Sequence, residues 1–148
     1  MNVGQVCGRQ VVTVLPDSDL SAAAQLMREK HVGYLVVVES DNMRKPVGVL
    51  TDRDIVVSVV AMKTDPASLT VGDIMTSCVI WTDEQTTLDA ALVQMHRNGV
   101  RRLPVLAPNG EVVGVLSIDD ALQAIMAELD HAAGSIRMER EAERAART

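Results

Sequence analysis

Apolar and polar positions follow two different periods along this chain, and the periods occur in the same order twice. Apolar residues spaced i, i+3, i+4 and i+7, which form one face of a helix, occur in residues 20–27 and again in residues 88–95. Short β-branched runs between polar loops predict strands at residues 11–14, 35–38, 47–50, 103–106 and 112–116, and a sixth strand ends at Trp81. Each half closes with a further predicted helix, at residues 53–61 and 119–129. The pattern predicts an α/β (α+β) fold made of two β-α-β-β-α units.

An internal duplication accounts for this repetition. Residues 11–38 align with residues 79–106 at a shift of 68, and the shift then falls to 66 because the first copy has the longer loop. We therefore predict two repeats that complete one core. Their expected bounds are residues 3–62 and 71–130, with a linker over 63–70 and a short helical lead-in over 71–75.

Each repeat closes with the same short phrase, a glycine followed by two aliphatic residues, a hydroxyl residue and, three positions later, an aspartate. The hydroxyl and acid are Thr51 and Asp54 in the first copy and Ser117 and Asp120 in the second. This spacing is a capping box in outline, which needs no ligand. However, the phrase occurs twice, follows a glycine that permits close backbone approach, and lies where a strand meets a helix start, a favoured place for ligands. An aspartate there can accept both hydroxyls of a ribose.

Composition excludes several classes of function. The core must be aliphatic, since the chain has 47% hydrophobic residues but one Trp, one Tyr and no Phe. A net charge of −6 argues against sequence-independent nucleic-acid binding, although a local basic patch remains compatible with it. No apolar run reaches the roughly 20 residues of a membrane span, and the N-terminus lacks a signal-peptide pattern. We expect a soluble, cytoplasmic protein.

Neither catalysis nor metal binding is indicated. Cys7 and Cys78 do not form a Cys-x-x-Cys pair, and we expect both to be buried, reduced thiols. The three histidines are scattered without metal-ligand spacing. Asp119 and Asp120 are adjacent and so point to different helix faces, which makes a poor acid/base pair. We predict that the chain is not an enzyme and needs no cofactor.

The two phrases and their surroundings resemble a tandem pair of cystathionine β-synthase (CBS) domains, often called a Bateman module. Typical stretches are Asp-Ile-Met-Thr at 73–76, Leu-Thr-Asp-Arg-Asp-Ile at 50–55 and Val-Arg-Arg-Leu-Pro-Val at 100–105. The resemblance implies two repeats packed through their sheets with pseudo-twofold symmetry, two clefts between them, and a homodimer. It also implies binding of an adenosine-containing ligand such as AMP, ADP, ATP, S-adenosylmethionine or NAD.

The resemblance assigns ligand contacts to both clefts. Thr51 with Asp54, and Ser117 with Asp120, would each hold a ribose. Arg101 and Arg102 would meet a phosphate in the Asp54 cleft, whereas the corresponding positions of the Asp120 cleft, Gly33 and Tyr34, carry no charge. We therefore predict tighter binding of a phosphorylated ligand in the Asp54 cleft. The alternative for the two arginines is a solvated charge or a pairing with Asp52, Asp119 or Asp120.

Three further residues are candidates for contact with the base or phosphate. Trp81 and Tyr34 can stack on an adenine, although a lone aromatic residue in an aliphatic protein also fills a core or an interface. Arg53 can reach a phosphate or remain at the surface.

The resemblance implies a sensor that changes the populations of its conformations when a nucleotide binds, a change that an unidentified partner protein detects. The alternative is a ligand-free structural or protein-interaction module. Residues 131–148 are rich in Ala, Glu and Arg and form either a solvated helix or a frayed tail. A helix there could also brace a dimer.

Overall fold

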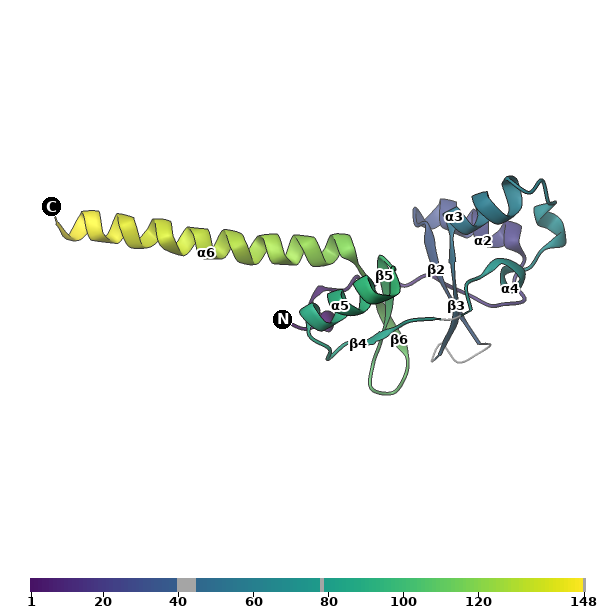
Figure 1. The fold of residues 1–148 in the computed structure, drawn as a ribbon, viewed down its shortest axis with the longest axis horizontal. Coiled ribbons are helices and arrows are strands. Elements are labelled where there is room, and N and C mark those ends of the chain that lie inside the picture. The colour runs from purple at the N-terminus through teal and green to yellow at the C-terminus, as the bar shows by residue number, and fades with distance from the viewer. Residues whose placement is uncertain (40–44, 78, 148) are drawn as a thin grey trace.

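Two three-stranded sheets of identical topology form the body of the protein (Figure 1). The computed structural model describes residues 1–39, 45–77 and 79–147. In each sheet a short first strand pairs parallel with the middle strand, which pairs antiparallel with the third. The strands are β1 (Thr13–Val14), β2 (Tyr34–Val38), β3 (Pro46–Thr51), β4 (Thr82–Asp83), β5 (Arg102–Leu106) and β6 (Val112–Ser117). The mixed α/β fold with two equivalent repeats is confirmed.

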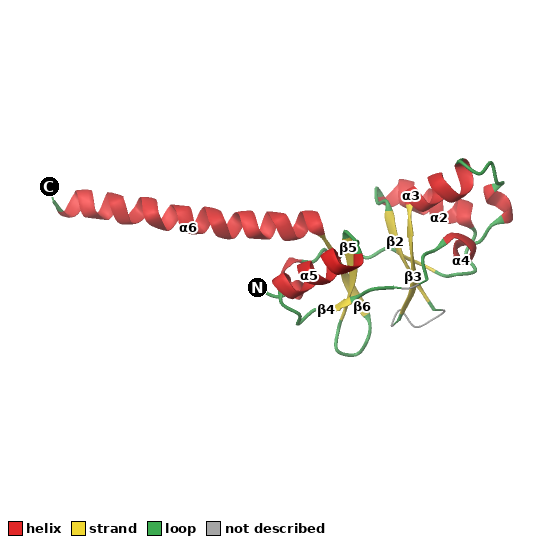
Figure 2. Ribbon diagram, in the orientation of Figure 1, coloured by secondary structure: helices red, strands yellow, loops and turns green. Residues whose placement is uncertain are grey.

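The two amphipathic helices form where their apolar period predicts them. They are α2 (Leu20–Lys30) and α5 (Leu88–Asn98). The side chain of Asp19 accepts a hydrogen bond from the Ser21 N–H at the start of α2, and the side chain of Thr87 accepts one from the Ala90 N–H at the start of α5. Both helices end at a residue in the left-handed conformation, His31 (φ 54°) and Gly99 (φ 63°). Figure 2 shows that α2 lies with the first sheet and α5 with the second.

Two elements of the first repeat differ from their predicted extents. The first strand is confined to β1, Thr13–Val14, rather than residues 11–14. The closing helix is α-helical only over α3 (Asp52–Ile55) and continues as a π-helix, η1 (Val56–Val60). Four of the five η1 residues are valines, whose branched side chains crowd a regular α-helical turn.

Most buried hydrophobic residues of the described chain form two clusters, one in each repeat, whereas Val36, Val38 and Leu106 are buried outside both. The first cluster contains Leu20, Ala23, Met27, Leu35, Val37, Leu50, Val59 and Val71. The second contains Val3, Cys7, Leu88, Ala91, Met95, Leu103, Val105, Leu116 and Ala121.

The clusters exchange the short helices that precede each repeat. Val3, in α1 (Val3–Val6), packs with residues 88–121 of the second repeat. Val71, in α4 (Val71–Ile74), packs with residues 20–59 of the first, after the 3₁₀ helix η2 (Pro66–Ser68). Figure 1 shows the N-terminus beside α5, away from β2 and β3. Each lead-in therefore completes the core of the other copy.

The exchange explains the glycine of the repeated phrase. A Cβ on Gly48 would lie 2.5 Å from Sδ of Met75, and a Cβ on Gly114 would lie 2.7 Å from Sγ of Cys7. These glycines make room for the lead-in chains, so their close approach is to protein rather than to a ligand. Cys7 is buried, as predicted, and burial raises the pKa of its thiol. Cys78 lies outside the described residues.

The second closing helix and the C-terminal segment form one element. Helix α6 (Ile118–Ala146) has 29 residues and extends well beyond the body of the protein (Figure 1). Residues 131–146 are thus helical rather than frayed. Within the described residues, no helix is both long enough and apolar enough to cross a membrane.

Candidate functional site

Both repeated phrases form complete capping boxes. The Thr51 N–H donates to Oδ2 of Asp54 (2.8 Å), and the Asp54 N–H donates to Oγ1 of Thr51 (3.1 Å). In the second copy the Ser117 N–H and Oγ–H both donate to Oδ2 of Asp120, at 3.2 and 2.5 Å, and the Asp120 N–H donates to Oγ of Ser117. The helix-capping role that the sequence predicts for these residues is therefore present at both sites.

A third box of the same kind shows that capping alone does not define a ligand site. At the start of α4 the Thr70 N–H donates to Oδ2 of Asp73 (2.8 Å), as Thr51 does to Asp54. Neither Thr70 nor Asp73 is among the described residues that line the two cavities below. The repeated phrases differ from this box in their position at a cavity.

The first cavity, called the Asp54 cavity, lies between the two repeats and has a volume of about 350 Å³. This is at the lower end of the range for small-molecule sites. Its lining residues are Tyr34, Val49, Thr51, Arg53, Asp54, Thr76, Val79, Ile80, Gly99, Val100, Arg101 and Arg102. It therefore brings together six of the nine predicted site residues.

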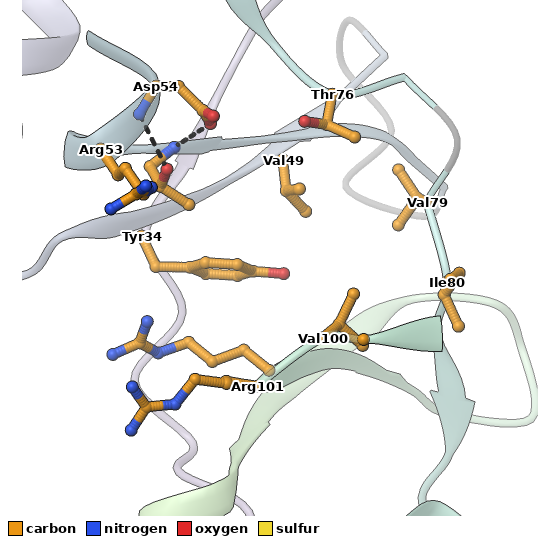
Figure 3. Close-up of a pocket in the computed structure, with 12 residues that line it drawn as sticks. Tyr34, Val49, Arg53, Asp54, Thr76, Val79, Ile80, Val100 and Arg101 are labelled. Carbon is orange, nitrogen blue, oxygen red and sulfur yellow. Dashed lines mark hydrogen bonds between the residues drawn. The ribbon is translucent and has the colours of Figure 1, made fainter. Parts of the chain in front are cut away.

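The Asp54 cavity has a cationic end and an apolar end (Figure 3). Arg53 and Arg101 lie on one side of it, above and below the ring of Tyr34, whereas Val79, Ile80 and Val100 lie on the other. Cζ of Arg102 lies 5.6 Å from the centroid of the Tyr34 ring, a cation–π distance. Burial raises the pKa of the Tyr34 hydroxyl and keeps it neutral, against the opposing effect of the Arg102 charge. The arrangement suits a ligand with an anionic group and an apolar, flat group.

The second cavity, called the Asp120 cavity, has a volume of about 300 Å³. Its lining residues are Gly8, Gln10, Val12, His31, Val32, Gly33, Tyr34, Arg102, Val115, Ser117 and Asp120. Gly33 and Tyr34 line it, as predicted, but so does Arg102. Arg102, which the sequence assigned to the Asp54 cleft alone, thus lines both cavities and gives the Asp120 cavity a positive charge that the prediction did not include.

Trp81 is not brought to either cavity. Its side chain is 43% exposed, and its backbone carbonyl accepts a hydrogen bond from Nε2 of Gln94 (2.7 Å).

Arg101 lies 3.9 Å from Asp119, and both side chains are exposed. Such an exposed ion pair contributes little to the stability of the fold. This is one of the pairings that the sequence left open.

Several lining residues carried no recognisable signal in the sequence. Val79 and Ile80 form the apolar end of the Asp54 cavity, and Gln10 and His31 line the Asp120 cavity. The repeat alignment pairs His31 with Gly99, which lines the other cavity, so equivalence between the repeats was the one available clue.

Comparison with known proteins decides the family. The family model described as the CBS domain matches residues 3–61 and again residues 71–127. The chain belongs to the CBS domain family. It contains two CBS domains in tandem, and a CBS-domain protein from Burkholderia ambifaria has the same fold, with a TM-score of 0.76 and 30% identity over 86% of this chain and 95% of that one.

Curated relatives include both short CBS proteins and parts of longer ones. An uncharacterised protein from Methanopyrus kandleri is 34% identical over 83% of this chain, which spans 62% of that relative's length. Hypoxic response protein 1 from Mycobacterium tuberculosis is 33% identical over 81% of this chain and 78% of its own length. Inosine-5'-monophosphate dehydrogenase from Methanocaldococcus jannaschii is 33% identical over 80% of this chain, but the match covers 22% of that enzyme. The likeness to that enzyme is confined to a small part of it.

Proposed function

We propose that this CBS pair is a regulatory module whose Asp54 cavity binds a phosphorylated adenosine ligand such as AMP, ADP or ATP. One observation carries the proposal. The carboxylate of Asp54, three arginines and an apolar wall converge from both repeats on one cavity of about 350 Å³. The carboxylate suits two ribose hydroxyls, the guanidinium groups suit phosphate, and the apolar wall suits a purine base.

One comparison structure of the same fold contains adenosine-type ligands. The CBS domain pair of protein MJ0100 was solved with 5'-methylthioadenosine and S-adenosyl-L-methionine, and it has the same fold (TM-score 0.74). At 22% identity this likeness concerns the fold alone. S-adenosylmethionine and NAD remain candidate ligands, but the three arginines favour a ligand that carries phosphate, which NAD does and S-adenosylmethionine does not.

Because the ligand would contact both repeats, its binding would favour one arrangement of the two. A ligand shifts such an equilibrium only by its difference in affinity between the two arrangements. A ligand that bridges Thr51 and Asp54 with Arg101 has such a difference. An unidentified protein partner would respond to this change, and we infer no catalytic step.

A thermal-shift screen tests the proposed binding against the alternative, a ligand-free structural or interaction module. A ligand present at a hundred times its dissociation constant stabilises the fold by about 2.7 kcal/mol. We expect AMP, ADP or ATP to raise the melting temperature more than adenosine does at the same concentration. If no adenosine compound raises it, the capping boxes serve only the fold.

The two cavities should differ in affinity. Arg53, Arg101 and Arg102 line the Asp54 cavity, whereas Arg102 alone among the described Lys and Arg residues lines the Asp120 cavity. Calorimetric titration with AMP should therefore show a larger loss of the tight phase in Asp54→Ala than in Asp120→Ala. Equal losses would contradict the asymmetry.

We also propose that α6 forms the contact of a homodimer. Its outer surface carries an apolar stripe at alternating spacings of four and three residues, namely Leu122, Met126, Leu129, Ala133 and Ile136, all exposed. Residues 118–131 of α6 contain four acidic side chains and no Lys or Arg, whereas residues 132–147 contain four arginines and three glutamates, a net charge of +1. Antiparallel contact with a second α6 would cover both stripes and place each acidic half beside an arginine-rich half.

A further inference from the structure

Tyr34 and Arg102 form one wall that separates the two cavities. Both side chains line both cavities, and the guanidinium lies 5.6 Å from the ring centroid. The two residues are equivalent in the repeats, because each begins a middle strand and pairs with the hydroxyl residue of its own phrase, Tyr34 with Thr51 and Arg102 with Ser117. The pseudo-twofold relation therefore brings a tyrosine and an arginine together at the boundary of the cavities.

The cavities depend on Arg102 to different degrees. In the Asp54 cavity two other arginines, Arg53 and Arg101, are available to a phosphate. Among the described residues lining the Asp120 cavity, Arg102 is the one arginine, and His31 is the remaining basic side chain. The guanidinium of Arg102, which gives the Asp120 cavity its permanent positive charge, thus also lines the Asp54 cavity.

We propose that Arg102 couples the two cavities, so that a phosphorylated ligand in one weakens the binding of a phosphorylated ligand in the other. This inference rests on the proposed function. A guanidinium presents its donors in one planar fork, so a bidentate contact with phosphate directs the fork toward a single cavity. A second phosphate then meets fewer donors and the negative charge of the first. The effect is reciprocal, because a coupling free energy between two sites acts equally in both directions.

Titration calorimetry with AMP measures the coupling directly. The variants Asp54→Asn and Asp120→Asn each weaken one ribose site but keep a side-chain oxygen that can accept the capping hydrogen bond. Each variant therefore reports the affinity of the unaltered cavity for AMP while the altered cavity is empty. In the unsubstituted protein we expect the second AMP to bind about tenfold more weakly than the matching single-site variant indicates.

Adenosine provides the matched ligand control, because it lacks the phosphate that would hold Arg102. We expect its two binding steps to differ from the single-site affinities by less than about threefold. A similar tenfold weakening with adenosine would show that the coupling does not depend on phosphate and would overturn the role of Arg102.

Arg101 provides the matched residue control, since it neighbours Arg102 but lines the Asp54 cavity and not the Asp120 cavity. Arg102→Gln should weaken AMP at both cavities and reduce the coupling to less than about threefold. Arg101→Gln should weaken AMP at the Asp54 cavity and leave the coupling near its original value. Equal loss of coupling in the two variants would overturn the proposal.

The outcomes separate this inference from the proposed function. If AMP binds both cavities of the unsubstituted protein independently, the proposed function stands and the coupling is refuted. If AMP binds neither cavity, the proposed function fails and the coupling fails with it.

Discussion

Tyr34 is the only tyrosine in the chain. Its surroundings should make the fold less stable as the pH rises into the alkaline range. Burial raises the pKa of its hydroxyl above the ordinary value near 10, and the charge of Arg102 offsets only part of that effect. A raised pKa means that the native state holds the proton more tightly than the unfolded state does. The resulting contribution to stability is fully present below the unfolded pKa and is lost as the pH rises above it.

The variant Tyr34→Phe should remove this contribution, because phenylalanine cannot ionise. We expect the free energy of unfolding of the unsubstituted protein to fall more steeply between about pH 8 and about pH 11 than that of Tyr34→Phe. Urea denaturation at the two pH values measures both slopes. Equal slopes would mean that Tyr34 ionises as readily in the native state as in the unfolded chain.

Single residues also show where sequence reasoning succeeded and where it stopped. Thr51 and Asp54 were predicted correctly as a capping box at a strand end, since that pattern is local. The shared position of Arg102 could not be predicted, because it depends on how closely the pseudo-twofold relation brings Tyr34 to it. Gly48 was predicted to permit a close approach to the backbone, and only the structure shows that the approaching group is the side chain of Met75.

Helix α6 offers a direct test of self-association. The stripe residues Met126 and Leu129 are each 64% exposed. The double variant Met126→Glu and Leu129→Glu should dissociate the proposed dimer, because it places charges in an apolar contact. Analytical ultracentrifugation gives the mass of each form.

The control for this experiment is Gln123→Glu, which adds a negative charge to the same exposed helix outside the apolar stripe. We expect it to keep the mass of the unsubstituted protein. A variant that lacks residues 134–148 should likewise have the mass of a monomer, because the extension of α6 forms part of the proposed contact. A monomer in the unsubstituted protein, or a dimer in the double variant, would contradict the proposed contact.

Elements with strong local signals formed as predicted, and weak ones did not. The amphipathic period and capping residues of α2 and α5 are contained in their own sequence. The extent of β1 instead depends on how far its partner β2 can pair with it. In η1 the apolar run indicated a helix, but nothing in the sequence indicated its π form.

The exchange of lead-in helices links the two repeats into one chain fold. Val3 is fully buried in the core of the second repeat, 85 positions before Leu88. Val3→Ala should lower the free energy of unfolding by about 2 kcal/mol, since it removes buried methyl groups and leaves a cavity. In hydrogen exchange, the loss of protection should appear in α5 before α2.

The same substitution at Val93 provides the control, because this side chain on α5 is 48% exposed. Val93→Ala should change the free energy of unfolding by less than about 0.5 kcal/mol. Loss of protection in α2 and not α5 after Val3→Ala would contradict the exchange. The exchange of the lead-in helices could not be predicted from the sequence, since both helices carry apolar residues that either sheet could accept.

The most direct test of the account compares two aspartates with the same capping role. Asp54 and Asp73 each accept a 2.8 Å hydrogen bond from the N–H of the threonine three residues earlier, but Asp54 lines the Asp54 cavity, whereas Asp73 lines neither that cavity nor the Asp120 cavity. We predict that in calorimetric titrations with AMP, Asp54→Ala loses at least about tenfold in affinity while Asp73→Ala keeps the affinity of the unsubstituted protein. Equal affinities in all three proteins would mean that Asp54 only caps its helix, and the proposed nucleotide site would be wrong.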